Sequence, residues 1–103
     1  MKVFVSGSLI GKGRYHQYYL HGKIFLGKGL INEHKKYILG GLDSILPEKG
    51  ARMQGEVYEV DAAALAKLDF LHNETVYTRG IVDVELENGE TVQANAYIWN
   101  GKV

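Results

Sequence analysis

The chain has no cysteine, a single proline and no long apolar run, and these absences narrow the classes of protein to which it can belong. Without cysteine there is neither a disulfide framework nor a thiolate site. No apolar stretch approaches the roughly 18 residues of a membrane span, and no charged-then-apolar leader opens the chain as in a signal peptide. The sequence therefore predicts a cytoplasmic protein that does not bind membranes.

Net charge is also absent, because 12 basic and 12 acidic residues cancel, and this removes the simplest electrostatic case for nucleic-acid binding. A length of 103 residues with 46% hydrophobic residues predicts one domain, residues 1–103, with one modest core. The charges are unevenly spread. In residues 1–40 the only carboxylate is that of Glu33, whereas the cations are Lys2, Lys12, Arg14, Lys23, Lys28, Lys35 and Lys36. Such a basic surface either attracts a small carboxylate ligand or simply aids solubility.

The sequence carries no recognisable metal or nucleotide motif. No histidine pairs with another at the i+4 spacing of a zinc site, and Gly11-Lys12-Gly13 lacks both the Walker spacing and a dinucleotide fingerprint. We therefore predict neither a metal nor an organic cofactor.

The first stretch of the chain is the strongest candidate for a binding element. Val3 to Val5 form a β-branched and aromatic run typical of a buried strand, and Ser6-Gly7-Ser8 ends it in a tight turn of small residues. Such a turn leaves the backbone N–H groups of Gly7, Ser8 and Leu9 able to bind an anionic or carbonyl oxygen. The alternative is an ordinary turn after a strand.

The middle of the chain predicts short elements separated by glycines. Arg14 to His21 has the spacing of a short helix, and Lys23 to Leu30 and Tyr37 to Leu46 resemble short strands with bends or bulges at their glycines. A loop is predicted from Pro47 to Gly50, followed by a strand from Met53 to Val60.

Asp61 is predicted to cap a helix over the run AAALAKLDFL, in which alanines and leucines are strong helix formers. Leu65, Leu68 and His72 recur at helical spacing, so the imidazole of His72 faces the interior with the leucines. The last third predicts a hairpin, with alternating strands over 77–86 and 91–99 joined at Asn88-Gly89. The resulting fold class is α+β, a small mixed, partly closed β-barrel with one short and one longer helix.

Six motifs, in this order, resemble those of the gamma-glutamylcyclotransferase-like family. After the Gly-Ser-Leu that ends the first strand come His-x-x-x-Leu (His16 to Leu20), Phe-Leu-Gly-x-Gly (Phe25 to Gly29), Gly-Glu-Val-Tyr-Glu-Val-Asp (Gly55 to Asp61), Leu-Ala-x-Leu-Asp (Leu65 to Asp69) and Tyr-x-Arg (Tyr77 to Arg79). The resemblance covers nearly the whole chain. It implies a small barrel around a cavity that binds a γ-glutamyl or amino-acid-like ligand. It also implies an activity that releases 5-oxoproline from a γ-glutamyl amine or peptide without a cofactor.

The resemblance also implies the site residues. The first-loop residues Ser6, Gly7, Ser8 and Leu9 would grip the γ-glutamyl group, where family members carry Tyr-Gly-Ser/Thr-Leu, so the tyrosine is missing at Ser6. Tyr77 would line the cavity, and so would Tyr97, although aromatic residues on strands are more often core.

The family's catalytic glutamate is missing as well. It would follow the helix in Leu-Asp-x-x-Glu-Gly, where this chain has His72 and Asn73. The candidate bases are His72 and, two residues later, Glu74. Two alternatives stay open: an enzyme with an altered base, or a silent relative, with His72 as a structural histidine, that keeps the cavity and binds a small amino-acid-like ligand or a protein partner. Asp69 would pair with His72 or with Arg79, as an orienter or as a structural salt bridge.

Overall fold

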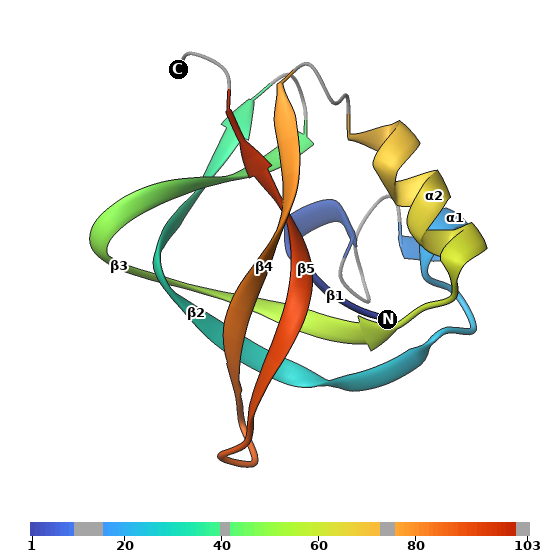
Figure 1. Cartoon of the computed structure of the whole chain (residues 1–103), viewed down its shortest axis with the longest axis horizontal. Coiled ribbons are helices and arrows are strands. Elements are labelled where there is room, and N and C mark those ends of the chain that lie inside the picture. Colours follow the sequence, from blue (N-terminus) through green and yellow to red (C-terminus); the bar gives the residue numbers. More distant parts are fainter. Residues whose placement is uncertain (10–15, 40–41, 73–75, 101–103) are drawn as a thin grey trace.

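The computed structural model of the protein describes residues 1–9, 16–39, 42–72 and 76–100. In these residues the chain forms an α+β barrel (Figure 1). Its elements in chain order are β1 (Lys2–Val5), the 3-10 turn η1 (Gly7–Leu9), α1 (His16–Tyr19), β2 (Ile24–Leu39), β3 (Leu42–Glu59), α2 (Ala62–Leu71), β4 (Tyr77–Leu86) and β5 (Thr91–Trp99).

The five strands close into a mixed barrel in the order β1-β3-β2-β4-β5. β1 completes the circle because it pairs with β3 antiparallel and with β5 parallel, so that Val3 lies opposite both Tyr58 and Asn95. A second parallel pairing joins β3 to β5 at Ile45 and Ile98. The predicted fold class is confirmed, with full closure of the barrel.

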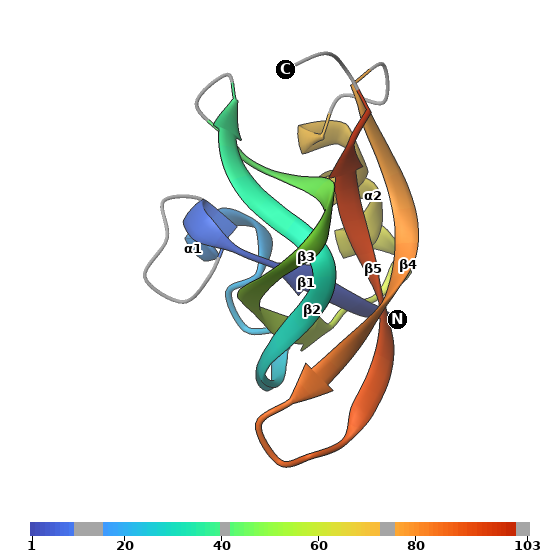
Figure 2. The same cartoon turned by 90° about the vertical axis from the view of Figure 1, so that its left-hand side faces the viewer.

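The β2–β3 hairpin differs from the prediction. The short strands expected over 23–30 and 37–46 are wrong, because β2 and β3 run on as long strands that bend together (Figure 2). The pairing continues past two irregularities, where the register shifts between Phe25 and Gly27 and again between Asn32 and His34. Gly29 is paired in regular register with Gly55, so this glycine does not end the strand. The loop predicted from Pro47 to Gly50 is also wrong, since these residues belong to β3 at the second irregularity.

Both predicted helices are present, on the same side of the barrel (Figure 1). α1 is confirmed over His16–Tyr19, while residues 14–15 of the predicted helix lie outside the described part of the chain. The Asp61 cap of α2 is confirmed, because its Oδ1 accepts a hydrogen bond from the Ala64 N–H at 2.8 Å. Ala64, Leu65 and Leu68 form the buried face of α2.

The apolar residues divide into two clusters that share the barrel wall. One fills the barrel and includes Phe4, Ile31, Val57, Val84 and Ala96. The other lies between the barrel and the helices, and it contains Val3, Val5, Leu9, Leu20, Tyr58, Val60, Ala64, Leu65, Leu68, Tyr77 and Tyr97.

β4 and β5 pair along their whole length as predicted, from Tyr77 opposite Trp99 to Glu85 opposite Thr91. Among the described residues, none of the helices has the length and apolar character needed to cross a membrane.

Candidate active site

His72 ends α2 and turns its side chain into the protein, as predicted. Its backbone N–H and its ring Nδ1 both approach the carbonyl oxygen of Leu68, at 3.0 Å and 2.8 Å. A carbonyl oxygen only accepts hydrogen bonds, so the proton of the neutral imidazole lies on Nδ1 and Nε2 keeps its lone pair. Among the described residues Nε2 has no hydrogen-bond partner.

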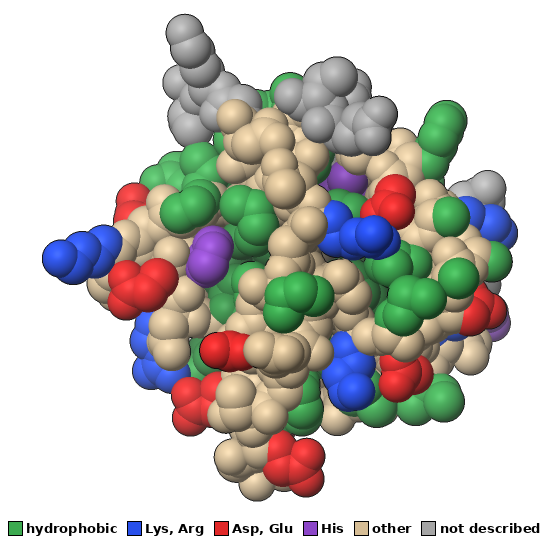
Figure 3. Space-filling view, viewed as in Figure 1, with side chains coloured by type: hydrophobic (Ala, Val, Ile, Leu, Met, Phe, Trp, Pro, Cys, Tyr) green, Lys and Arg blue, Asp and Glu red, His purple; other side chains and the backbone are tan. Residues whose placement is uncertain are grey.

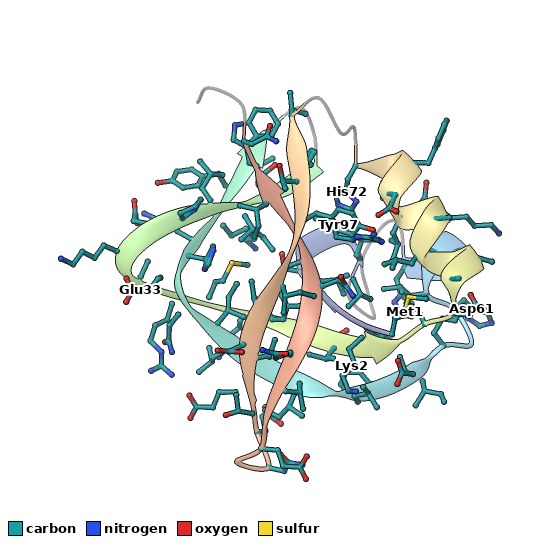
Figure 4. All side chains as sticks on the ribbon, in the orientation of Figure 1. Met1, Lys2, Glu33, Asp61, His72 and Tyr97 are labelled. Carbon is teal, nitrogen blue, oxygen red and sulfur yellow. The ribbon has the colours of Figure 1, made fainter. Side chains whose placement is uncertain are left out.

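Two tyrosine rings enclose the imidazole of His72. The ring of Tyr97 stacks on it with centroids 3.9 Å apart (Figure 4). The ring of Tyr77 meets it edge-on, with centroids 5.1 Å apart. This burial lowers the pKa of His72 below its ordinary value of 6.5, although the Leu68 carbonyl and the charge of Asp69 act in the opposite direction. Burial therefore outweighs the helix C-terminus, and the histidine is neutral near pH 7.

Asp69 connects the end of α2 to β4 and β5. Its Oδ1 accepts a hydrogen bond from the Tyr97 hydroxyl at 2.6 Å, and its Oδ2 lies 3.2 Å from Nη1 of Arg79. Of the two pairings considered for Asp69, the structure forms the one with Arg79. Burial, together with the bond to Asp69, raises the pKa of Tyr97, so this hydroxyl stays protonated and acts as a donor.

His72 lines a small hollow together with Ser6 and Leu9 of the first loop. The hollow is lined by Phe4, Val5, Ser6, Leu9, Ile45, His72 and Tyr97. Its volume is only about 10 Å³, which is close to the minimum for one water molecule. The side chains that line it therefore leave no room for a γ-glutamyl group in this conformation.

Ser6 also borders a much larger groove. Its volume is about 590 Å³, within the range of small-molecule sites. It is lined by Ser6, Gly7, Lys28, Gly29, Leu30, Lys36, Gln54, Gly55, Glu56, Glu85, Leu86 and Glu87. Among the residues that the structure describes, Ser6 is the one that lines both the hollow and the groove.

The structure distributes the predicted first-loop residues between these two spaces. Ser6 borders both, Gly7 lines the groove and Leu9 lines the hollow. Ser8 belongs to η1, and its side chain lies outside what the structure describes. The tight turn after the first strand is thus confirmed, and Gly7 adopts a φ of 58°, a conformation that favours glycine.

The other predicted site residues, Tyr77, Tyr97 and Glu74, lie in different places. Tyr77 contacts His72 but lines neither space, and its hydroxyl lies 2.6 Å from Oγ of buried Ser44. Tyr97 does line the hollow, in addition to its stacking on His72. Glu74, the alternative base, lies outside the described residues. No group of three or more His, Asp or Glu side chains that could hold a metal ion occurs in the described ranges.

The sequence analysis did not identify Phe4 and Ile45 as residues that line the hollow. It also did not identify the acidic residues that line the groove. The basic character of residues 1–40 did mark Lys28 and Lys36, but only the bend of β2 shows that both reach one groove. The remaining charges are mixed: the face in Figure 3 shows Lys, Arg, Asp and Glu side chains interspersed, without an extended area of one sign.

Comparison with known proteins gives a consistent result over nearly the whole chain. The family model for gamma-glutamyl cyclotransferase, AIG2-like, matches residues 3–103. A putative gamma-glutamylcyclotransferase of Methanocaldococcus jannaschii is 33% identical over 99 residues, covering 94% of this chain and 82% of that protein. A putative gamma-glutamylcyclotransferase of Drosophila melanogaster is 32% identical over 108 residues, covering 94% and 68%. The crystal structure of a mouse AIG2-like protein superposes with a TM-score of 0.86 at 28% identity, covering 99% of this chain and 78% of its own.

Proposed function

The chain belongs to the gamma-glutamyl cyclotransferase, AIG2-like family, and on that premise we propose that it releases 5-oxoproline from a γ-glutamyl amine or peptide, with His72 as the catalytic base. The supporting observation is the state of His72. Its Nδ1–H is held by the Leu68 carbonyl and its pKa is lowered by burial, so Nε2 can accept a proton beside the first loop.

The proposed reaction is an intramolecular transfer of the γ-acyl group. Nε2 of His72 takes a proton from the α-ammonium group of the substrate, whose amine nitrogen then attacks the γ-carbonyl carbon. The new C–N bond closes a five-membered ring and leaves an oxyanion, for which we propose the backbone N–H groups of Gly7 and Ser8 as donors. The N–H of Leu9, the third predicted donor, instead donates to the Ser6 carbonyl at 3.3 Å. The imidazolium returns its proton to the leaving nitrogen as the old C–N bond breaks. The imidazole, neutral again, then takes the extra proton that the ring nitrogen carries after its attack and passes it to solvent. The products are 5-oxoproline and a free amine, and no water is consumed.

A second candidate function is favoured by the size of the hollow. About 10 Å³ between His72 and Ser6 holds no substrate unless the lining side chains move, and the histidine replaces the carboxylate of the family pattern. In this alternative the chain is a silent relative that binds a small amino-acid-like ligand or a protein partner. A cytoplasmic location and the absence of nucleic-acid partners stay predictions in both cases.

The two functions separate in an assay of 5-oxoproline release from a panel of γ-glutamyl amines and peptides. For the enzyme we expect product with the native protein, and a loss of about 100-fold or more in His72→Gln, since a general base contributes about 10² to 10⁴ in rate. His21→Gln, at an exposed histidine, is the matched control and should keep full activity. If only Glu74→Gln abolishes release, the base is Glu74 and the assignment to His72 is wrong.

Absence of product with every compound would instead favour the binding function, provided that an amino-acid-like ligand raises the melting temperature. His72→Glu then tests the family's own base. Gain of 5-oxoproline release in this variant would mean that the substrate site is intact and only the base has been lost.

A further inference from the structure

One edge of β4 is left without a partner strand along most of its length. β2 closes the barrel against β4 at two facing pairs near the Leu86 end of the strand. Beyond these pairs β2 bends away, because its register shifts between Asn32 and His34, where Glu33 adopts a φ of 64°. Among the described strands, residues 78–84 therefore pair with β5 alone. In Figure 2 this part of β4 lies at the right-hand margin of the molecule, with no other strand beyond it.

The free edge presents backbone groups that point away from β5. The N–H of Leu86 donates to the Glu90 carbonyl on the β5 side, whereas the N–H of the next residue, Glu87, donates to the Lys28 carbonyl of β2. The backbone groups of successive residues point to opposite sides of a strand, and β4 pairs with β5 without a register shift. No described residue pairs with the groups that point to the free edge, which are the N–H and C=O groups of Arg79, Ile81 and Asp83.

The side chains of these three residues are also exposed, while those between them are half-buried. Ile81, with 61% of its surface exposed, lies between a cation and an anion. Asp83 forms neither an ion pair nor a hydrogen bond with any residue in the described ranges. Arg79 contacts Asp69 through Nη1 at 3.2 Å, and a guanidinium has five donors, so it can meet a second carboxylate.

We propose that this edge pairs with the same edge of a second copy of the chain, as an antiparallel β4–β4 dimer with its two-fold axis at Ile81. In this register the two Ile81 side chains contact each other, and Arg79 of each copy lies opposite Asp83 of the other. Facing residues of antiparallel strands have Cβ atoms about 4.5 to 5.5 Å apart, which is close enough for an ion pair. Each facing pair also exchanges two backbone hydrogen bonds, because its N–H and C=O groups point to the edge. The proposal does not depend on the proposed function.

The charges favour this register over its neighbours. Shifting the axis to Gly80 or to Val82 would place Ile81 opposite a charged residue. Shifting it to Arg79 or to Asp83 would place like charges opposite each other, which destabilises a sheet. A two-fold axis also uses the free edge of each copy once, so the pairing closes as a dimer and leaves no edge for a third copy. In a protein that stays monomeric, the same charges would instead keep the edge from pairing.

Arg79 connects this edge to the candidate active site. In the dimer its guanidinium would lie between two carboxylates, Asp69 of its own copy and Asp83 of the other. Asp69 also accepts the hydrogen bond from Tyr97, whose ring stacks on His72. The contact between the copies is therefore continuous with the interactions that hold the end of α2.

Sedimentation velocity of the native chain at protein concentrations of about 5 to 500 µM tests the association. Because an edge contact of this length is small, we expect a dimer that dissociates within this range. Asp83→Arg should weaken the dimer at least about tenfold, because it places like charges opposite each other twice. Glu90→Arg makes the same change of charge at an exposed residue outside the edge, and it should associate as the native chain does. A native chain that stays monomeric at the highest concentration, or equal losses in both variants, would overturn the proposal.

A mixture of two variants tests the register. Arg79→Asp and Asp83→Arg each leave charges of one sign on the edge, so neither should associate with itself. Combined, they are complementary at both pairs and should form a heterodimer, and a mixture that stays monomeric would contradict the register. Circular dichroism establishes that each variant is folded, since Arg79→Asp also loses the contact with Asp69. If that variant does not fold, the amide measurement below decides the register.

Amide hydrogen exchange followed by NMR identifies the surface through which the copies meet. The N–H groups of Arg79, Ile81 and Asp83 should exchange at least about tenfold more slowly at high than at low protein concentration, as the dimer forms. Those of Gly80 and Val82 face β5 and should be protected at every concentration. A dimer in which the first three amides stay unprotected would mean that the copies meet elsewhere, and the proposal would be wrong.

Discussion

The imidazole of His72 lies flat against the phenol ring of Tyr97, with centroids 3.9 Å apart and planes within 4° of parallel. The Tyr97 hydroxyl in turn donates to Asp69, three residues before His72 on the last turn of α2. The end of α2 is therefore held to β5 by both a ring contact and a hydrogen bond. The orientation of the His72 ring therefore depends on Tyr97, in a catalytic as in a structural role.

Tyr97→Phe should destabilise the fold, because it removes the hydroxyl that donates to Asp69 while keeping the ring that stacks on His72. A hydrogen bond to a charged group contributes about 1.5 to 3 kcal/mol to the free energy of unfolding. The bond to Asp69 is only partly buried, so we expect a loss near the lower end of this range. Urea denaturation measures this loss. Tyr37→Phe is the matched control, since its hydroxyl donates to Glu48 at 3.2 Å on the exposed surface and should matter little. Equal effects of the two variants would contradict the role given to the Tyr97 hydroxyl.

Acid should weaken the fold through His72. Burial lowers the folded-state pKa of this histidine below 6.5, so between that pKa and pH 6.5 the unfolded chain binds more protons than the folded one. The free energy of unfolding should therefore decrease as the pH falls from about 7.5 through 6.5. Urea denaturation at several pH values gives this slope. His72→Gln should reduce the slope, and an unchanged slope in this variant would refute the assignment.

Gly55→Ala should be strongly destabilising, because a Cβ at this position would lie 2.4 Å from the carbonyl oxygen of Val5 and 2.5 Å from the Phe4 ring. Overpacking of this kind, with backbone as one partner, costs at least about 2 kcal/mol. Thermal unfolding followed by circular dichroism measures the change. At Gly80 an added Cβ would meet nothing within 4 Å, so Gly80→Ala should shift stability by less than about 0.5 kcal/mol. A stable Gly55→Ala variant would mean that β1 and β3 pack less closely.

Asp61→Ala should cost about 1 kcal/mol of stability by leaving the Ala64 N–H at the start of α2 without its acceptor. Asp61→Asn keeps an oxygen acceptor at the same place and should retain most of the native stability. Denaturation midpoints of the two variants provide the comparison. If both lose the same amount, the charge of Asp61 rather than its capping bond supports the helix.

The parts of the fold that could be predicted are those with a strong local signal. The α2 helix has a capping aspartate and three alanines at its start, and the β4–β5 hairpin has an Asn88-Gly89 turn between alternating strands. The inward orientation of His72 followed from its spacing to Leu65 and Leu68, and burial at 5% exposure confirms it. In each case neighbouring residues in the sequence determine the outcome.

The β2–β3 hairpin could not be predicted because its bends are produced by pairing rather than by local preference. Gly27 and Glu33 adopt positive φ values at the two register shifts, and β3 continues through Pro47 and Gly50 because β2 lies beside it. The groove depends on that bend. The sequence therefore identifies its lysines as basic residues but does not show that they line the same groove. The volume of the hollow likewise depends on how Tyr97 and Ile45 fill it.

Closure of the barrel has a consequence for how the chain acquires its structure. Val3 pairs with Asn95, and the Asn95 side chain donates to the Lys2 carbonyl, so the first and last strands meet across more than ninety residues. During synthesis β1 can pair with β3 early, but its other edge stays without a partner until β5 emerges from the ribosome. Contacts of such sequence separation slow folding. The half-made barrel thus presents an unpaired edge to chaperones and to other nascent chains from the emergence of the end of β3 until that of β5.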